Sequence, residues 1–595
     1  MRNPRTQGPH RRWRLALASG AAVSLLLPLL IETPAGAAGP GCASPPSVVA
    51  DPSSVPVHTT GTGYTTIEGS TPTTFDVDVL GVIPDGITLG VDLIVVRLTG
   101  PQQFLDDTGG VFFGMSGSPV YIDGDKDTGD LLGALSYGWW NDPTLAGLTP
   151  APAMLQMFDL PTIDHPSFSA RIPITRSMQR TVVASGTDVS DSSGSFQEMP
   201  TVLSVPAQGR RLRQLRHMVR DTTNGVRVVG PAGASAGAPV VSGNDFGVGE
   251  PVSSIVSYGD ASIWAAGTVS IVCPSDTNVI AMYGHPLFWN SPGPVTLGLN
   301  GVNVLTIAHS PAWWNDMVPV ITDVRGSVTA DRFVGEVGQV GLAPTTFPIT
   351  SSFTSPDTGL SRNDAETDTV YQQDWFYQWE TWLHMVLNLD AVFQRISSGS
   401  SNLSWTLSFE DADGNLYDIT NRVHYYSNWD ATDGIWKLIS EIDQLQYSDF
   451  GPMRFTSLDA TGSITATNDT GTITGVNTSS ALQKALRSRH VIRVKAGHAV
   501  TVEVNQTPAA GGADVVTTFT LKVPHSWHGQ HRVTVRGGED RWWGGRGDDT
   551  LRELVKELNG GEHADDVIVQ GIGRKASQTS PLIVTGRKRF TIDVV

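Results

Sequence analysis

Two patterns of hydrophobic and polar positions divide the chain near residue 350. Before it, short segments follow the two-residue period of strands: residues 75–82 alternate apolar and polar side chains, and residues 89–98 are almost entirely apolar. Comparable segments recur at 253–257, 263–272 and 278–282. Alternation is typical of a half-buried strand, and a short apolar run is typical of a fully buried one. We therefore expect the first 350 residues to be mainly β.

Helical periodicity begins beyond residue 370. Apolar residues recur at three- and four-residue spacing over 374–397 and over 434–446, with strand patterns between and after them, which predicts an α+β module over 360–480. Alternating runs over 485–540 predict a β-sandwich module with immunoglobulin-like strands. A short capped helix and two strands are expected to complete the chain over 541–595.

The composition agrees with a strand-rich protein of several domains. A chain of 595 residues is too long for one domain, and its 63 glycines and 37 prolines indicate many turns. Only 16% of the residues are charged, and the net charge is −18. Because a nucleic-acid-binding protein needs a basic stripe, we expect no nucleic-acid partner.

Residues 1–37 have the three parts of a secretion signal: a basic start, an apolar stretch and an Ala-Gly-Ala cleavage sequence at 35–37. The pair Arg11 and Arg12 leaves both the general and the twin-arginine export routes open. The apolar stretch is shorter than the roughly 20 residues of a spanning helix, and an uncleaved anchor is the alternative. We expect a secreted or cell-envelope protein with no stable membrane span after signal removal.

Cys42 and Cys273 are the only cysteines of the chain. In an oxidising compartment such a pair readily forms a disulfide, and two unpaired thiols are the alternative. The 14 histidines are scattered along the chain and show no metal-ligand spacing. We therefore expect no metal site.

The segment richest in possible chemistry is the turn at residues 114–119, Gly-Met-Ser-Gly-Ser-Pro, which joins an apolar strand end to a β-branched strand. A serine hydroxyl reacts when a turn exposes it and backbone N–H groups point at the same place. Gly114 and Gly117 accept positive φ and leave room for a substrate carbonyl. We identify Ser116 as the candidate nucleophile and the N–H groups of Gly114 and Ser116 as the candidate oxyanion hole. A hairpin turn without chemistry is the alternative.

This segment resembles the serine segment of chymotrypsin-like peptidases, GDSGGP, and more closely that of the SpoIVB-type sporulation serine peptidase family, TGGIVQGMSGSP. Residues 108–119 of this chain read TGGVFFGMSGSP, with the same spacing. The resemblance implies a chymotrypsin-like double β-barrel over 38–350. It also implies hydrolysis of peptide bonds in other proteins by a serine nucleophile, without a cofactor.

A base for Ser116 is expected at His285. Histidine is the side chain whose pKa suits proton transfer near neutral pH, and His285 follows a short apolar strand in the sequence AMYGHP. The family carries its histidine in a similar strand-end segment, ALGH, but before the serine, whereas His285 follows Ser116. Catalytic triads occur in several chain orders. We therefore expect two barrels in swapped order, serine half before histidine half, with the site in the cleft between them.

The acid that would orient the histidine has two candidates. The position of the family's aspartate, 15 residues before the serine, holds Pro101. Asp92 lies in VDLIVVRL, which resembles the segment that carries the chymotrypsin-like aspartate. Asp331 lies 46 residues after His285, close to the His-to-Asp spacing of those enzymes. We rank Asp92 slightly ahead of Asp331, and a serine–histidine dyad without an acid is the alternative.

These expectations together describe an exported serine endopeptidase that acts on envelope or extracellular proteins. The rival hypothesis is a catalytically inactive peptidase scaffold that serves as a cell-envelope binding or adhesion protein. The swapped order of the two residues and the long C-terminal part favour the scaffold. The presence of both Ser116 and His285 next to glycines favours the enzyme.

Overall fold

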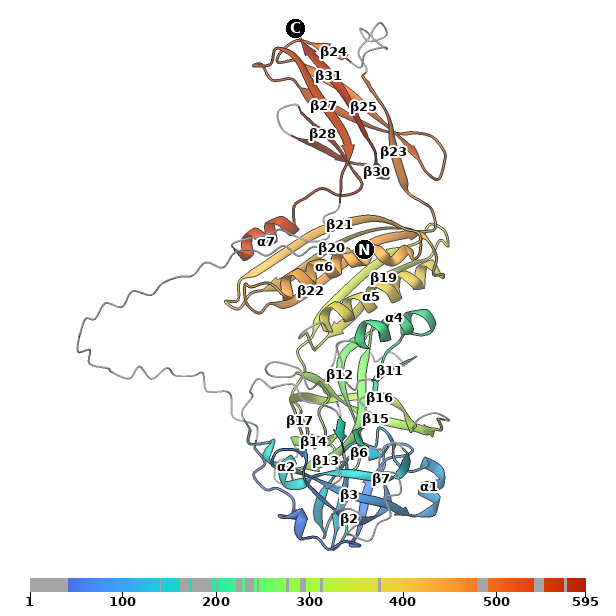
Figure 1. Ribbon diagram of the computed structural model, residues 1–595, viewed down its shortest axis with the longest axis vertical. Helices are drawn as coiled ribbons and strands as arrows, with labels where there is room; N and C mark the ends of the chain where they lie inside the picture. Colours follow the sequence, from blue (N-terminus) through green and yellow to red (C-terminus); the bar gives the residue numbers. More distant parts are fainter. Residues whose placement is uncertain are drawn as a thin grey trace, which may run out of the picture.

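The computed structural model describes residues 41–139, 141–160, 171–173, 195–199, 202–220, 227–230, 240–242, 245–273, 278–288, 296–310, 314–372, 376–478, 491–539, 550–571 and 575–595. The expected signal over 1–37 lies outside these residues. The units follow one another along the long axis, from the N-terminal strands at one end to the C-terminal strands at the other (Figure 1). No helix of the described ranges is long and apolar enough to cross a bilayer.

The first unit is a closed barrel of six antiparallel strands in the order β5-β1-β2-β3-β7-β6, with β6 pairing back onto β5. Its strands are β1 (Thr60–Thr65), β2 (Thr73–Thr88), β3 (Val91–Gly100), β5 (Ser118–Ile122), β6 (Asp130–Trp139) and β7 (Asp142–Pro150). Phe75, Val77 and Val79 of β2 point inward and are fully buried, as the alternation predicts. The remaining elements of this unit are η1 (Pro52–Ser54), the helices α1 (Gln102–Thr108) and α2 (Ala151–Gln156), and the short strands β4 (Phe112–Phe113), β8 (Arg171–Pro173) and β9 (Ser195–Glu198).

The pairings of the next strands close a second ring of six antiparallel strands, in the order β13-β14-β17-β16-β15-β12 and back to β13. They are β12 (Pro251–Gly259), β13 (Ile263–Val272), β14 (Val279–Met282), β15 (Leu297–Ala308), β16 (Asn315–Arg332) and β17 (Gly335–Val340). Two short strands, β10 (Val202–Ser204) and β11 (Arg227–Val229), extend the sheet beyond β13. The expectation of a mainly β N-terminal half with two barrels therefore agrees with the strand pairing.

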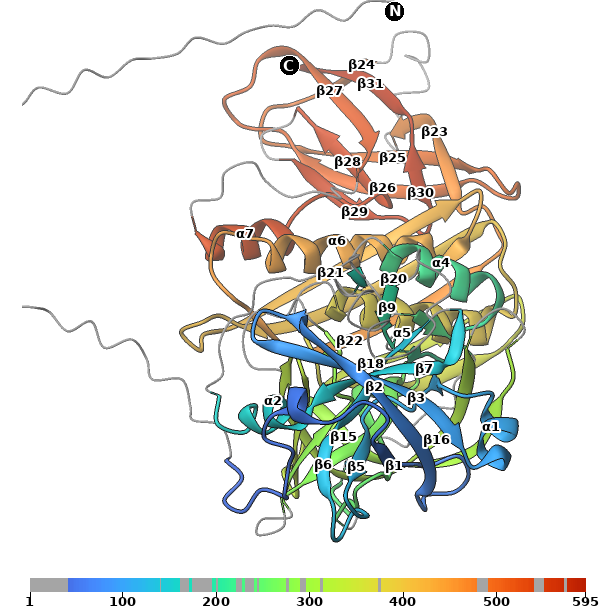
Figure 2. The same ribbon diagram turned by 60° about the horizontal axis from the view of Figure 1, so that its bottom comes forward.

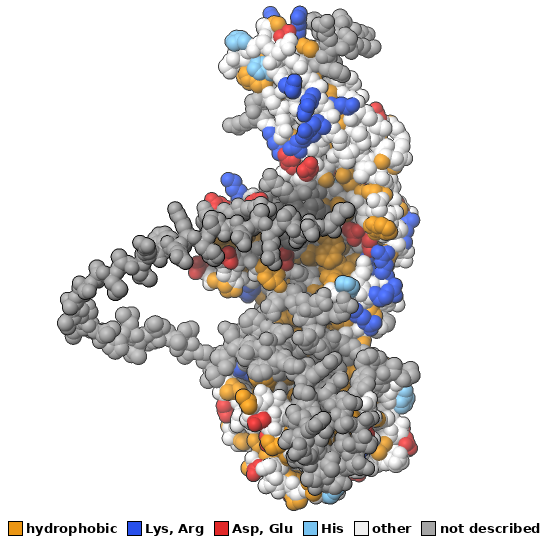
Figure 3. Space-filling model, in the orientation of Figure 1, with side chains coloured by type: hydrophobic (Ala, Val, Ile, Leu, Met, Phe, Trp, Pro, Cys, Tyr) orange, Lys and Arg blue, Asp and Glu red, His pale blue; other side chains and the backbone are white. Residues whose placement is uncertain are grey.

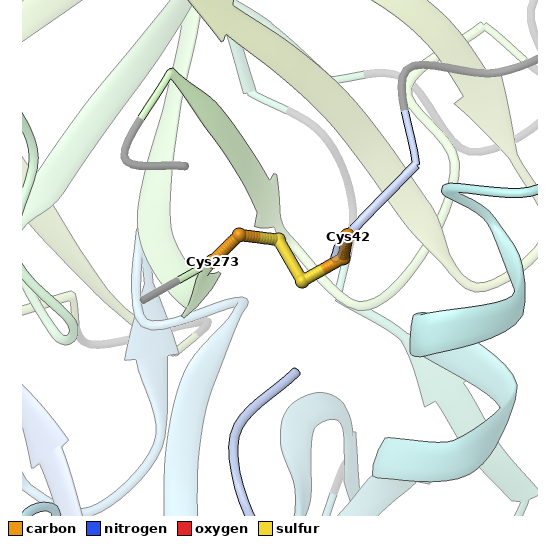
Figure 4. The surroundings of a disulfide bond; sticks show 2 residues. All are labelled: Cys42 and Cys273. Atoms are coloured by element: carbon orange, nitrogen blue, oxygen red, sulfur yellow. A yellow bond between two sulfur atoms is a disulfide. The ribbon is translucent and has the colours of Figure 1, made fainter. Parts of the chain in front are cut away.

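The two barrels pack directly against each other. One hydrophobic cluster joins Phe112 and Phe113 of the first unit to Val302 and Met317 of the second, and strands of both units lie side by side in Figures 1 and 2. The expected disulfide is confirmed: Cys42, ahead of β1, is bonded to Cys273 at the end of β13 (Figure 4). The chain before the first barrel is thereby tied to the second barrel.

The α+β module continues the sheet of the second barrel, because β19 pairs with β12. Its strands are β18 (Phe347–Thr354), β19 (Ser361–Thr369), β20 (Gly399–Glu410), β21 (Leu416–Ser427) and β22 (Arg454–Thr465). The two expected helices are present as α5 (Phe376–Phe393) and α6 (Ile435–Gln446). Helix α5 packs against β18, β19 and α6, which buries its apolar side chains, and η2 (Ala431–Gly434) leads into α6.

Helix α4 (Gly209–Arg220) docks onto this module through a buried arginine. The Arg211 side chain is 5% exposed and donates to Asp390 at 2.7 Å and to Asp430 at 2.6 Å. A buried guanidinium needs such carboxylate partners, because an unpaired buried charge is costly. The ion pairs therefore hold α4 against α5 and the segment that precedes η2.

The C-terminal unit consists of two sheets with one shared core. One sheet has the order β26-β25-β23-β30 and the other β24-β31-β27-β28-β29, and a single hydrophobic cluster fills the space between them. The strands are β23 (Thr470–Thr478), β24 (Val491–Val494), β25 (Ala499–Pro508), β26 (Val515–Lys522), β27 (Gly529–Gly537), β28 (Asp566–Gln570), β29 (Ala576–Thr579), β30 (Ile583–Thr585) and β31 (Arg587–Val594). This sandwich takes in β23 and the strands after residue 541, so it is larger than the range 485–540.

Helix α7 (Leu551–Leu558) leaves the sandwich and returns to the α+β module. Leu554 and Leu558 join the core of that module, and Asn559 donates to the Asp418 carbonyl and accepts from the Thr420 N–H. Lys and Arg side chains gather on the visible face of the sandwich (Figure 3), although the whole chain has a net charge of −18.

Candidate active site between the two barrels

The turn that carries Ser116 passes from one barrel to the other. Just before it, β4 pairs in parallel with β16 of the second barrel, Phe112 opposite Asn315 and Phe113 opposite Asp316. Just after it, β5 begins at Ser118 and pairs with β1 and β6 of the first barrel. Ser116 therefore lies at the contact between the barrels.

The two glycines that flank Met115 and Ser116 are required by close approach of the second barrel. Gly114 has φ 99° and Gly117 has φ 94°, and residues with a Cβ atom rarely adopt such positive values because of steric clash. A Cβ on Gly117 would lie 2.1 Å from the Thr268 carbonyl oxygen, and a Cβ on Gly114 would lie 2.8 Å from Met317 Cβ. Only glycine fits at both positions.

Strand β13 of the second barrel donates hydrogen bonds to three carbonyl oxygens of the serine turn and so holds the turn in place. The Thr268 hydroxyl donates to Gly114 O at 3.1 Å, and the Thr268 N–H donates to Ser116 O at 2.8 Å. The Ser270 hydroxyl donates to Gly117 O at 2.7 Å. These carbonyl groups are therefore fixed toward β13.

Ser116 itself is left available for chemistry. The neighbouring N–H groups are used: Met115 donates to Phe112 O at 3.1 Å and Gly117 donates to Leu135 O at 2.8 Å. In contrast, neither the N–H nor the hydroxyl of Ser116 makes a hydrogen bond to another residue in the part of the chain that the structure describes. The residue is 5% exposed.

The histidine segment is clamped in the reciprocal way, by the first barrel. Beyond β14, Tyr283 and Gly284 both have left-handed backbone, with φ 67° and 71°. The Thr149 hydroxyl of β7 donates to Gly284 O at 2.6 Å, and a Cβ on Gly284 would lie 2.0 Å from the Ser136 hydroxyl oxygen of β6. A left-handed residue other than glycine, here Tyr283, is costly for a chain, and such residues cluster at functional sites. Tyr283 and Gly284 together direct the backbone into His285.

One residue of β13 links the two candidate segments. The Thr268 N–H donates to Ser116 O at 2.8 Å, and the Thr268 carbonyl accepts from the Tyr283 N–H at 3.3 Å. Tyr283 precedes His285 by two residues. The fold therefore brings together the serine and histidine segments, which are far apart in the sequence.

The His285 ring has a defined tautomer. Its Nδ1 lies 2.9 Å from the Pro286 carbonyl oxygen. The centroids of the His285 and Tyr283 rings are 6.1 Å apart, with an angle of 33° between the ring planes. Because a carbonyl oxygen only accepts, this contact requires a proton on Nδ1. Nε2 is then the basic nitrogen of the neutral ring. The imidazole is 2% exposed.

The two candidate acids lie in different surroundings. Asp331, near the end of β16, accepts hydrogen bonds from the N–H groups of Leu287 at 2.9 Å and Phe288 at 2.6 Å, directly after His285 in the chain. Asp92, near the start of β3, accepts from the Asp85 N–H at 2.9 Å and belongs to the β2–β3 hairpin. The contacts of Asp331, which we ranked second, are therefore the ones that support the histidine segment.

A buried carboxyl group behind the histidine segment was not anticipated from the sequence. Glu336 of β17 is 0% exposed and accepts from the Ser254 hydroxyl at 2.5 Å, and Ser254 in turn accepts from the Tyr283 hydroxyl at 3.1 Å. Burial raises the pKa of Glu336 well above its usual value, and the charge of Asp331 raises this pKa further. Burial, and then the charge of Glu336, raise the pKa of Tyr283. A single acid next to a turn gives no sequence signal for such a position.

A cavity of about 360 Å³ begins at the serine turn. Phe113 and Gly114 line it together with Trp264 and Ala266 of β13 and Met317 of β16, so the segment that leads into Ser116 and the second barrel form its wall. The lining is mainly apolar. A cavity with this lining suits the side chain of a hydrophobic residue.

No group of three His, Cys, Asp or Glu side chains in the described ranges is placed to hold a metal ion. No family model, no curated protein and no solved structure matches the chain. The geometry of the site and the sequence resemblance are therefore the basis for a functional hypothesis.

Proposed function

We propose that this protein is a serine peptidase of the chymotrypsin-like type, with Ser116 as nucleophile and His285 as general base. The observation that carries the proposal is the link through Thr268, which hydrogen-bonds to both candidate segments. Each segment is also clamped by the opposite barrel. A turn without chemistry would not need two unrelated segments to be held together in this way.

In the proposed mechanism, Nε2 of His285 takes the proton of the Ser116 hydroxyl as Ser116 Oγ attacks the scissile carbonyl. The imidazolium then returns the proton to the leaving amine. The hydrogen bond from Nδ1 to Pro286 O leaves the lone pair of the neutral ring on Nε2. The Ser116 hydroxyl makes no hydrogen bond to other described residues, and catalytic hydrogen bonds often tighten only when substrate binds.

We propose Asp331 in place of Asp92 as the acid that supports the histidine. Its carboxylate accepts two backbone hydrogen bonds from the loop that contains Pro286, so it fixes the carbonyl that orients the imidazole. Such charge-assisted bonds are stronger than neutral ones. Asp331 and His285 belong to the same barrel and Ser116 belongs to the other.

The proposed substrates are proteins of the cell envelope or the exterior, cut at limited sites, as the resemblance and the secretion signal imply. The cavity beside Gly114 suggests that a large apolar residue lies near the cleaved bond. The oxyanion hole would contain the N–H groups of Gly114 and Ser116. No cofactor is implied.

Labelling with a fluorophosphonate tests the proposal on the mature chain from residue 38. We expect the wild type to be labelled, and Ser116→Ala and His285→Ala to lose the label. His58→Ala is the matched control, since this histidine is 57% exposed and pairs with Asp78 on the surface; it should label like the wild type. A folded wild type without label, or label retained in Ser116→Ala, would contradict the proposal.

The second candidate function is a catalytically inactive scaffold that binds or adheres at the cell envelope through its C-terminal modules. The burial of the two candidate residues favours it, because Ser116 is 5% and His285 only 2% exposed. In that case the wild type stays unlabelled while its disulfide and cooperative unfolding are intact. The same labelling experiment therefore separates the two functions.

A further inference from the structure

The orientation of the Ser116 N–H is set by a side chain two residues away. The carbonyl oxygen of Met115 accepts a hydrogen bond from the Ser118 N–H at 3.1 Å and another from the Ser118 hydroxyl at 2.6 Å. Ser118 is 0% exposed, so water does not compete for this carbonyl. The carbonyl of the peptide between Met115 and Ser116 is thus held at one orientation by two donors on one residue.

Because this peptide bond is trans and planar, its N–H points away from its C=O. The Met115 carbonyl points toward Ser118, so the Ser116 N–H points in the opposite direction. Among the N–H groups of residues 115–118, that of Ser116 is the one without an acceptor among the residues that the structure describes, whereas Met115, Gly117 and Ser118 all donate.

We propose that Ser118 is a positioning residue of the oxyanion hole, whose hydroxyl fixes the Met115–Ser116 peptide so that the Ser116 N–H faces the substrate carbonyl. This inference rests on the peptidase function proposed above. A backbone N–H stabilises an oxyanion only when it is already oriented before charge develops. Without the Ser118 hydroxyl, the peptide keeps a single donor and can rotate toward other orientations.

Strand β12 supplies a matched control for this hydrogen bond. Ser257 is also fully buried, and its hydroxyl donates to Ala261 O at 2.7 Å, outside the serine turn. Ser118→Ala and Ser257→Ala therefore each remove one buried hydroxyl from one carbonyl. Only Ser118→Ala releases the peptide that contains the Ser116 N–H.

The experiment measures the second-order rate of fluorophosphonate labelling as a function of pH, with the melting temperature of each variant as a check on folding. The phosphoryl oxygen of the probe occupies the oxyanion hole as Ser116 Oγ bonds to phosphorus, so the rate reports on the N–H. Removing one such donor costs about 100- to 1,000-fold in comparable enzymes. For a donor that is misoriented rather than removed, we expect a loss of about tenfold or more in Ser118→Ala.

The other variants should separate positioning from stability. Ser257→Ala should lower the melting temperature about as much as Ser118→Ala and label within about twofold of the wild type. Ser118→Thr, which keeps the hydroxyl, should restore the rate. The pH at half-maximal rate should be unchanged in Ser118→Ala, because His285 is untouched.

Two results would overturn the inference in distinguishable ways. If the folded wild type is not labelled, the peptidase function fails and the role of Ser118 fails with it. If the wild type is labelled but Ser118→Ala reacts no more slowly than Ser257→Ala, the function stands and the role of Ser118 is refuted. A shift in the half-maximal pH of Ser118→Ala would also refute it, since it would show that the base was altered.

Discussion

Replacing Asp331 with asparagine tests whether this carboxylate holds the histidine segment in place. In the wild type, its two oxygens accept from the N–H groups of Leu287 at 2.9 Å and Phe288 at 2.6 Å. Asparagine offers one oxygen, and its NH₂ group faces the second N–H. A hydrogen bond to a charged group contributes about 1.5–3 kcal/mol, and 1.36 kcal/mol corresponds to a factor of ten. We therefore expect one of the two amides to exchange hydrogen about 10 to 100 times faster.

The assay is hydrogen–deuterium exchange followed by mass spectrometry on peptides that cover 278–288, with fluorophosphonate labelling measured in parallel. Asp331→Asn should show faster exchange there and slower labelling, because the Pro286 carbonyl loses its support. Asp92→Asn is the control, and its exchange should change only in the β2–β3 hairpin around Asp85. If Asp92→Asn abolishes labelling while Asp331→Asn changes neither exchange nor labelling, the reasoning is refuted.

Three further predictions follow from single contacts. Reducing the Cys42–Cys273 disulfide, which closes a separation of 231 residues, should lower the free energy of unfolding by about 5 kcal/mol on the chain-entropy estimate, seen in denaturant titrations with and without reductant. Gly284→Ala should lower the free energy of unfolding by several kcal/mol, since the new Cβ would lie 2.0 Å from the Ser136 hydroxyl oxygen. Gly341 also has positive φ but has open space around it, so Gly341→Ala should cost only about 1–2 kcal/mol. Burial raises the folded-state pKa of Glu336, so its carboxyl group keeps its proton in the folded state at pH values where the unfolded chain has lost it. The free energy of unfolding of the wild type should therefore fall as the pH rises above about 4.3, the pKa of an unfolded glutamate, and Glu336→Gln should flatten this fall when unfolding is measured across pH.

Local patterns were sufficient to predict several elements of the fold. The alternation in β2 predicts the inward-facing Phe75, Val77 and Val79, which are fully buried. The three- and four-residue spacing predicts α5 and α6 within a few residues of their ends. Helix α1 (Gln102–Thr108) escapes such reasoning, since seven residues are too few to show a period. Closure of the barrels also escapes it, because β1 and β5 pair across more than fifty residues without any shared local signal.

The candidate site divides in the same way. Ser116 and His285 could be named as candidates because each stands next to a glycine that the contacts require. Gly117 lies against the Thr268 carbonyl, and Gly284 lies against Ser136. Such steric demands leave a mark in the sequence. Residue spacing could not decide whether Asp92 or Asp331 supports the histidine segment. The hydrogen bonds of Asp331 come from the N–H groups of a loop more than forty residues earlier in the chain. Backbone donors have no sequence signature.

The reciprocal clamps also explain why the order of the two halves in the chain need not matter for a site of this kind. The serine turn is fixed by Thr268 and Ser270 of the second barrel, and the histidine segment is fixed by Thr149 of the first. Neither segment depends on the connection between the barrels for its position. Since triads are defined by geometry and roles, exchanging the order of the barrels preserves the site as long as the same faces meet. The disulfide between Cys42 and Cys273 adds a covalent tie between the segment before the first barrel and the second barrel.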